Sequence, residues 1–570
     1  MRWDRSPLPW LLGFLAIAAG NDGTALPVSP LYARAGEIPQ ALADNSDATR
    51  GNWVSIIDDG YDALLLRVHL IRNAQHSICV QTMILQNDEC GRLMMYELIQ
   101  AAKRGVKVRL LADQFMSSRD RKWVAFLATA HPNLELKYYR PPADHINPPR
   151  VVTLLHGVLA FRAANQRMHN KIMLFDDTIV ITGGRNIDNH YYNHSTSYNF
   201  IDRDVMVIGP VVPTVAASFE EYWEFRRCVP AQKLVDVAAV IRKGAFDRPE
   251  TREEFQFNGF FSELDREAGD PDLIRERFAG PFRPANKVEF LADSPGKNRT
   301  VGLWGGGKGT RRIRKLMRST DDNLVFQSPY LILSWSGRRG FRKLHRRHPE
   351  VQVTVSTNSY AATDNTLAYA ANYKLRSTYI QDLGWRIYEF KPHPDDLLTL
   401  LPNYPDLERR AREASQRRAP FLSVHAKSFV RDDRIAYIGS YNMDPRSDNL
   451  NTEAGLLIED ENIARALKET ILRATRPESS WVIAKSRFPL ANVNYLIEGL
   501  SGLSPVDLWP LRNTSSFELI QGKEPVPPGH EDFYENYQDA GSFPGAEGLS
   551  TKEIVTSLYK IFGGLAIPVL

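Results

Sequence analysis

The sequence predicts an α/β protein made of two similar α/β/α repeats, related by a pseudo-twofold axis and forming one site between them. Three observations lead to this fold class: a segment that occurs twice, a constant offset between its copies, and apolar strands that alternate with amphipathic helices in each half. The chain has 570 residues, of which 43% are hydrophobic and 24% charged. This composition is that of a folded protein and excludes a disordered or collagen-like chain.

The repeated segment covers twenty residues in each half. Its first copy runs from His169 to Asp188, and its second from His425 to Asp444. Each copy reads His-x-Lys-x4-Asp, followed by Gly-Gly or Gly-Ser and then, after one more residue, Asn. The offset of 256 residues between His169 and His425 holds to the end of the segment. An unbroken register of this kind indicates an internal duplication.

Strands and helices alternate ahead of each copy of the segment. In the first half we expect strands at 77–81, 106–111 and 136–139 and a helix at 91–104, and in the second half strands at 323–327, 351–356 and 385–388 and a helix at 340–347. This alternation predicts a largely parallel sheet in each half.

The predicted domain organisation has five parts. They are a signal-like or membrane-resting N-terminal segment (1–25), a first repeat (50–230), a linker (243–284), a second repeat (285–480) and a C-terminal extension with an amphipathic end (481–570). Arg2 and Arg5 ahead of an apolar run at 10–19 favour a short secretory signal, with a loose tail as the alternative. The amphipathic end is interpreted as a helix packed on the protein or lying in a membrane interface.

The duplicated residues have the chemistry of an anion site. Residues i and i+2 of a strand share a face, so His169 and Lys171 point the same way, as do His425 and Lys427. Small residues let a ligand approach the backbone, and asparagines donate amide hydrogens. The predicted catalytic residues are His169, Lys171, Asp176, His425, Lys427 and Asp432, and the predicted phosphate-binding residues are Gly184, Asn186, Ser440 and Asn442.

Two imidazoles and two ammonium groups that meet at a pseudo-twofold axis suit a phosphodiester. One neutral imidazole would attack phosphorus, and the opposing imidazolium would protonate the leaving alkoxide. The lysines offset the charge of the phosphoryl oxygens, so we expect no metal and no cofactor.

The duplicated motif with its Gly-Gly/Ser-x-Asn sequel resembles the phospholipase D superfamily. This resemblance implies a carboxylate downstream of each motif that orients the histidine, and the matching positions are Asp204 and Glu453. The surrounding sequence is most similar to bacterial cardiolipin synthases, in particular the branch that uses phosphatidylethanolamine. Segments 357–364 and 442–453 carry that likeness.

The resemblance implies a phosphatidyltransferase that works through a phosphohistidine and produces cardiolipin. A secreted phospholipase D that hydrolyses phospholipid to phosphatidic acid, and a nuclease or phosphodiesterase of the same superfamily, remain as alternatives. The expected partners are phosphatidylglycerol, phosphatidylethanolamine and an anionic membrane surface, with no nucleic acid. The expected location is the cell envelope, membrane-associated or exported.

Basic residues cluster at 311–315, 338–343 and 409–418. We interpret most of them as solvated helix faces. The alternative is attraction to anionic lipid head groups. Base-stacking aromatic residues do not alternate with these clusters, which disfavours a nucleic-acid groove.

Overall fold

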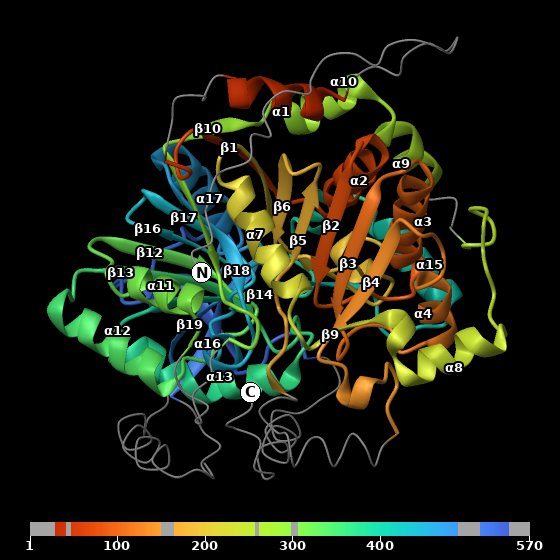
Figure 1. The fold of residues 1–570 in the computed structure, drawn as a ribbon. Helices are drawn as coiled ribbons and strands as arrows, with labels where there is room; N and C mark the ends of the chain where they lie inside the picture. The colour runs from red at the N-terminus through yellow and green to blue at the C-terminus, as the bar shows by residue number, and fades with distance from the viewer. Residues whose placement is uncertain are drawn as a thin grey trace.

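The computed structural model describes residues 29–40, 47–149, 165–256, 261–297, 306–487 and 513–546. Within them the chain forms two large mixed sheets that lie side by side, with helices covering their outer faces (Figure 1). The predicted segments at 1–25 and 551–570 lie outside the described residues. No helix in the described part of the chain is long and apolar enough to cross a bilayer.

The first sheet has the strand order β10-β1-β8-β6-β5-β2-β3-β4-β9. Its strands are β1 (Asn52–Ile57), β2 (Ser77–Thr82), β3 (Lys107–Asp113), β4 (Leu134–Tyr139), β5 (Ile172–Phe175), β6 (Ile179–Gly183), β8 (Asp204–Ile208), β9 (Cys228–Pro230) and β10 (Arg283–Ala285).

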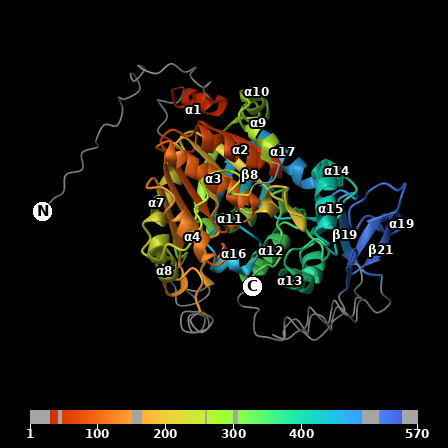
Figure 2. The same cartoon turned by 90° about the vertical axis from the view of Figure 1, so that its right-hand side faces the viewer.

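The second sheet repeats this order as β11-β18-β17-β16-β12-β13-β14-β19 and continues with β20 and β21. Its strands are β11 (Lys287–Ala292), β12 (Asn323–Gln327), β13 (Gln352–Asn358), β14 (Arg386–Phe390), β16 (Ser428–Arg431), β17 (Ile435–Gly439), β18 (Ala454–Glu459), β19 (Ser480–Lys485), β20 (Thr514–Leu519) and β21 (Tyr537–Gly541). From β1 to β9 the first sheet matches the second from β11 to β19, strand for strand, with β10 as an addition at the edge of the first. This correspondence confirms the duplicated α/β fold. The last two strands extend the far edge (Figure 2).

The prediction of a largely parallel sheet is wrong. Within the described strands of the two large sheets, parallel pairing is confined to β2-β3-β4 in the first lobe and β12-β13-β14 in the second. The reason is that the repeated segment folds as a β-hairpin in each lobe, β5-β6 in the first and β16-β17 in the second. The two strands of a hairpin run antiparallel. Asp176 and Asp177 form one hairpin turn with φ of 49° and 53°, and Asp432 and Asp433 form the other with 52° and 51°.

Helices cover both sheets. In the first lobe they are α1 (Pro30–Gln40), α2 (Gly60–Asn73), α3 (Glu89–Lys103), α4 (Arg121–Leu127), α7 (Val212–Trp223), α8 (Val235–Lys243), α9 (Phe261–Ala268) and α10 (Pro271–Ile274). In the second lobe they are α11 (Lys308–Met317), α12 (Trp335–Arg347), α13 (Thr366–Ser377), α14 (Leu397–Leu400), α15 (Tyr404–Glu413), α16 (Pro445–Asn449), α17 (Glu461–Arg473) and α19 (Phe533–Asn536).

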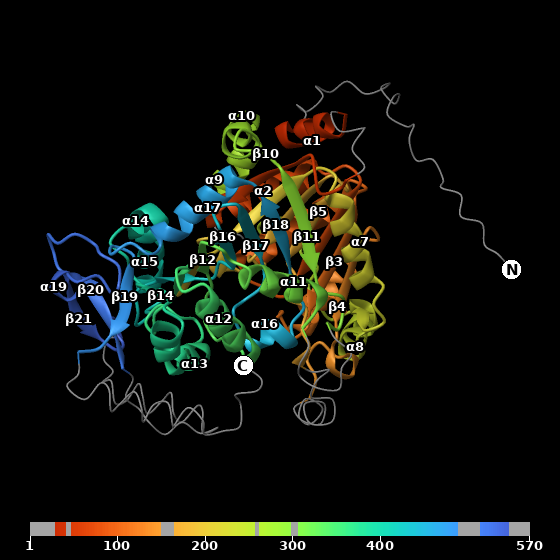
Figure 3. The same ribbon diagram turned by 90° about the vertical axis from the view of Figure 1, so that its left-hand side faces the viewer.

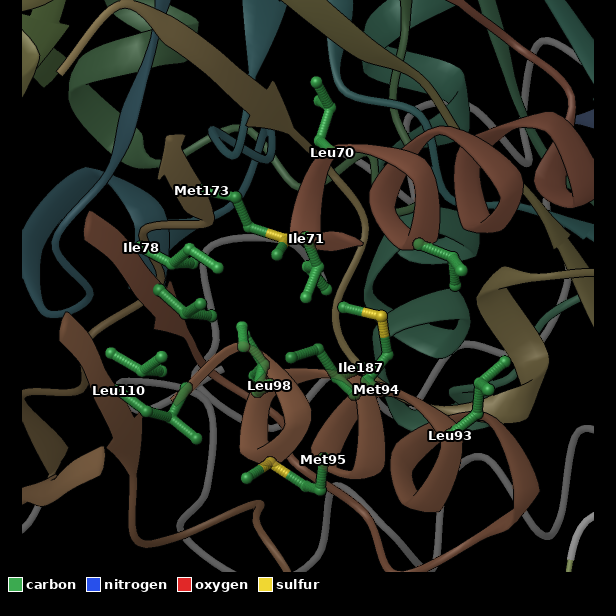
Figure 4. Packing of buried hydrophobic residues seen from close by; sticks show 14 of the residues in the cluster. Leu70, Ile71, Ile78, Leu93, Met94, Met95, Leu98, Leu110, Met173 and Ile187 are labelled. Carbon is green, nitrogen blue, oxygen red and sulfur yellow. The ribbon is translucent and has the colours of Figure 1, made fainter. Parts of the chain in front are cut away.

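The first lobe buries its largest apolar cluster between α2, α3 and the sheet. Ile71 of α2 and Leu98 of α3 point toward each other beside Ile78 and Leu110 of the strands (Figure 4). A second cluster joins the lobes, because α7 and α17 pack there with strands of both sheets. The lobes therefore share a core at their boundary, which fixes the position of one repeated motif relative to the other.

The segment predicted as a linker, 243–284, is largely built into the first lobe. Phe261 and Leu264 of α9 are buried in the cluster with α2, and β10 pairs with β1. Its charged, proline-punctuated composition reflects short helices with one buried face. The change from one lobe to the other comes at Asn286, between β10 and β11.

Candidate active site

A short two-stranded sheet across the lobe boundary places one histidine next to a carboxylate of the other lobe. β7 (Tyr198–Ile201) of the first lobe pairs in parallel with β15 (Phe421–Val424) of the second. The backbone N–H of His425 donates to the carbonyl of Ile201 at 2.8 Å. Asp202, the residue after β7, accepts a hydrogen bond from Nδ1 of His425 at 2.5 Å.

The other histidine is held in the corresponding way. Met168 and Thr452 form a parallel bridge between the lobes, and the backbone N–H of His169 donates to the carbonyl of Thr452 at 3.1 Å. Glu453 then accepts from Nδ1 of His169 at 2.9 Å. Each lobe thus supplies the carboxylate that orients the other lobe's histidine.

The structure corrects the assignment of Asp204 as a histidine-orienting residue. Asp204 begins β8 and pairs with two buried arginines, Arg67 at 2.8 Å and Arg185 at 3.4 Å. Asp202 takes the expected role instead. Counting back from the apolar strand would have identified it, because Asp202 stands three residues before Val205 as Glu453 stands three before Leu456. Counting forward from Asn186 fails because the first half has a longer loop there.

The two motif lysines lie close to the histidines in the interior. Nζ of Lys171 donates to the carbonyl of His169 at 2.7 Å, and Nζ of Lys427 lies 2.9 and 3.0 Å from the ring nitrogens of His425. Burial and the neighbouring Lys427 lower the pKa of Lys171 to about 7, and burial lowers that of Lys427 to about 8. Two such ammonium groups are stabilised when an anion lies between them.

Burial also keeps the imidazoles neutral. Burial and Lys427 lower the pKa of His425 to about 4, and burial with both motif lysines lowers that of His169 well below its ordinary value. Because each Nδ1 carries a proton toward its carboxylate, the lone pair of each neutral ring is on Nε2. Both histidine residues are 6% exposed. A neutral, oriented imidazole of this kind is a nucleophile or a base.

The two carboxylates differ in charge state. Burial raises the pKa of Glu453 to about 7. Burial alone would also raise the pKa of Asp202, but His425 and Lys427 hold it below its ordinary value. Asp202 is therefore a full anion at neutral pH, so a positive charge is better stabilised on His425 than on His169.

Gly184 and Ser440, predicted to bind phosphate, contact the carboxylates. A Cβ at Gly184 would lie 1.9 Å from Oδ1 of Asp202, so glycine leaves room for that side chain. Oγ of Ser440 donates to Oε2 of Glu453 at 2.6 Å. Gly184 and Ser440 therefore help to position the two carboxylates that orient the histidines.

The two motif asparagines are buried and have different partners. Nδ2 of Asn186 donates to the hydroxyl of Tyr191 at 2.8 Å. The buried Oδ1 of Asn442 accepts no hydrogen bond within the described part of the chain. Tyr191, which the sequence did not single out, stands edge-on to the ring of His425 with centroids 5.1 Å apart.

Asp176 and Asp432, predicted to be catalytic, lie at the far end of their hairpins. Asp176 accepts three backbone N–H groups from 75–77 at 2.7–2.8 Å, and Asp432 accepts three from 321–323 at 2.9–3.3 Å. They anchor the beginnings of β2 and β12 to the hairpins. The structure therefore corrects their role to a structural one.

Comparison with known proteins identifies similar sequences. The chain matches the family described as "Cardiolipin synthase, PLD-like domain" over residues 68–223 and 313–474. It is 30% identical over 445 residues to cardiolipin synthase C of Escherichia coli K12, covering 76% of this chain and 87% of that protein. It is 28% identical over 461 residues to an uncharacterized Helicobacter pylori protein, covering 81% and 84%. A solved phosphatidylserine synthase of Haemophilus influenzae aligns with 78% of this chain and 91% of that one, with a TM-score of 0.48 and 16% identity.

Proposed function

Because the chain belongs to the cardiolipin synthase family of phospholipase D-like enzymes, we propose that it transfers a phosphatidyl group between glycerophospholipids through a phosphohistidine. The supporting observation is the pair of buried histidines, each hydrogen-bonded through Nδ1 to a carboxylate of the opposite lobe. Two buried lysines beside them supply the positive charge that a phosphodiester requires.

In the first step Nε2 of His169 attacks phosphorus. Before this step, His425 takes up a proton on Nε2 beside the bound phosphodiester anion. A P–N bond forms and the P–O bond to the head group breaks, while the His425 imidazolium gives that proton to the leaving alkoxide and becomes neutral. In the second step the hydroxyl of an acceptor lipid loses its proton to His425. The new P–O bond forms, the P–N bond breaks, and both imidazoles return to their starting state.

The roles of nucleophile and general acid are assigned from the charge states of the carboxylates beside the two histidines. His425 has Asp202 as a full anion beside it, and the exposed Asp364 also raises the pKa of His425. These charges stabilise the imidazolium that a general acid must form. Glu453 has a pKa near 7 and gives His169 less of this support, which suits the residue that reacts as a neutral nucleophile.

Phosphatidylglycerol and phosphatidylethanolamine are the proposed substrates. Asp364 accepts a hydrogen bond from the hydroxyl of Tyr330 at 2.9 Å and acts electrostatically on both His425 and Lys427. An exposed carboxylate beside a tyrosine ring suits the ammonium group of a leaving ethanolamine. The proposed location is the cell envelope, at an anionic membrane surface.

The function is tested with purified full-length protein and labelled phosphatidylglycerol, with and without phosphatidylethanolamine, and separately with supercoiled DNA. We expect labelled cardiolipin, increased by phosphatidylethanolamine, from the parent protein and none from His169→Ala. Phosphatidic acid as the sole product would make water the acceptor and the protein a hydrolase. Nicked DNA without lipid turnover would refute the lipid assignment.

The affinity for the phosphodiester is expected to fall as the pH rises. Lys171 and Lys427, with pKa values of about 7 and 8, are charged below those values and lose their charge above them. The apparent KM should therefore rise roughly tenfold or more between about pH 6.5 and 8.5. It is measured with a soluble short-chain substrate. Lys171→Arg, whose charge is permanent, should show a weaker dependence; a KM that stays constant or falls in the parent enzyme contradicts the charge states proposed here.

A further inference from the structure

A large basic cavity lies on the outer face of the second lobe, apart from the histidines. Its volume is about 1030 Å³, and α11 and α12 contribute most of its walls. The two helices run across the same face of the lobe (Figure 3). The cationic lining residues are Arg311, Arg314, Lys315, Arg318, Lys343 and Arg347. Among the described lining residues the carboxylate is Asp321, which already pairs with Arg431 at 2.9 Å.

Several of these cations lack a counterion. Across the residues that the structure describes, no carboxylate lies within ion-pair distance of Arg318, Lys343 or Arg347. The side chain of Arg318 lies across Gly340, where a Cβ would come within 2.5 Å of its Cδ. Burial and the nearby Arg314 lower the pKa of Arg318. A cavity that gathers positive charge in this way is stabilised by an incoming anion.

The cavity extends along the lobe between the two ends of β12. Trp335 lines it near the carboxyl end, where the two motifs meet, and Asp321 lines it beside the amino end. β16 begins with the residue after Lys427 and runs antiparallel to β12, with Ser428 opposite Gln327, so His425 lies near the carboxyl end of β12. Trp335, on the cavity wall, begins α12 a few residues after that same end and is 61% exposed. In the first lobe, Phe115 and Met116 are exposed just after the carboxyl end of β3, which runs parallel to β2.

We propose that this face of the second lobe docks on an anionic bilayer, with acidic phospholipid head groups held in the cavity between α11 and α12 and with Trp335 entering the head-group layer. Basic side chains supply the attraction to acidic lipids, and tryptophan is favoured at the membrane–water boundary. The proposal deepens the proposed function, because it names the surface that would bring the catalytic site to its lipid substrates.

The docking surface is tested by vesicle co-sedimentation, which requires no turnover. Full-length His169→Ala protein is mixed with phosphatidylcholine vesicles with or without phosphatidylglycerol. We expect binding to the acidic vesicles, and a loss on the order of a hundredfold in partitioning when Arg318→Gln, Lys343→Gln and Arg347→Gln are combined. Trp335→Ala should weaken binding severalfold.

The matched control removes the same charge elsewhere. Arg409, Arg412 and Arg465 are exposed on α15 and α17, and each pairs with a carboxylate of its own helix at 2.7–3.4 Å. Their combined change to Gln should leave vesicle binding within a fewfold of the parent. Equal losses in both triple variants, or full binding by the cavity variant, would overturn the proposal, as would cavity-dependent binding of duplex DNA without binding of vesicles.

Turnover separates this inference from the proposed function. With His169 restored, the cavity variant should retain parent activity on a soluble short-chain lipid and lose it on vesicles. If the variant hydrolyses or transfers the soluble lipid normally and also binds vesicles normally, the docking surface is wrong and the catalytic assignment stands. If vesicles bind through the cavity but the parent protein does not turn over the soluble lipid, the docking surface stands and the catalytic assignment is wrong.

Discussion

His169→Ala and His425→Ala are each expected to lower kcat by roughly 10³-fold to 10⁴-fold or more, because each removes a group that forms or protonates a bond at phosphorus. Turnover of labelled lipid measures the loss, and circular dichroism checks that the fold is kept. His131→Ala is the matched control and should retain full activity, since the His131 ring accepts a local hydrogen bond from the backbone N–H of Asn133. Substantial activity in either motif variant would refute a single shared site.

The two variants should differ in what they accumulate. With a phosphodiester whose leaving group needs no protonation, His425→Ala should still form the P–N bond at His169 and then stall, because no base activates the acceptor. Acid quench followed by peptide mapping detects the phosphohistidine. His169→Ala should trap no label; label found on His425 would reverse the two roles.

Asp202→Asn is expected to lower kcat about 10²-fold to 10⁴-fold with little effect on folding. An amide can donate to Nδ1 of His425, which would place the imidazole proton on Nε2 and remove the charge that stabilises the imidazolium. Steady-state kinetics give the loss in kcat, and thermal unfolding gives the stability.

The neighbouring Asp204→Asn is the comparison that makes this test informative. It leaves the buried arginines Arg67 and Arg185 without their carboxylate, so we expect a loss of about 3–5 kcal/mol in the free energy of unfolding. The folded fraction should keep most of its catalytic rate. A selective loss of kcat in Asp204→Asn with normal stability would return the orienting role to that residue.

The duplication made most of the fold predictable, but not the direction of the strands. Register between the two copies is visible in the sequence because apolar strands and motif residues recur together. The pairing direction depends on the turn at Asp176 and Asp177, whose left-handed backbone sends β6 back along β5. A strand that alternates with helices favours parallel pairing, whereas a hairpin without an intervening helix must be antiparallel.

At the site, sequence could identify residue types but not which groups meet. His169 and Lys171 share a face by strand geometry, and their proximity follows from that alone. The motif aspartates could not be distinguished in this way, because a carboxylate seven residues after a histidine can reach either end of a hairpin. Pairing across the lobes, as for Asp202 with His425, depends on contacts between segments more than 200 residues apart.

The exchange of carboxylates between the lobes bears on how such a chain can evolve. A single repeat would contain a catalytic histidine, but the carboxylate that orients this histidine would come from another copy. Such a repeat could therefore act only as a symmetric dimer. Fusion of two such units keeps both partners at equal concentration and lets their outer loops diverge, as the longer loop ahead of β7 has done. The segments that cross the boundary, β7 with β15 and Met168 with Thr452, can change only in concert with their partners.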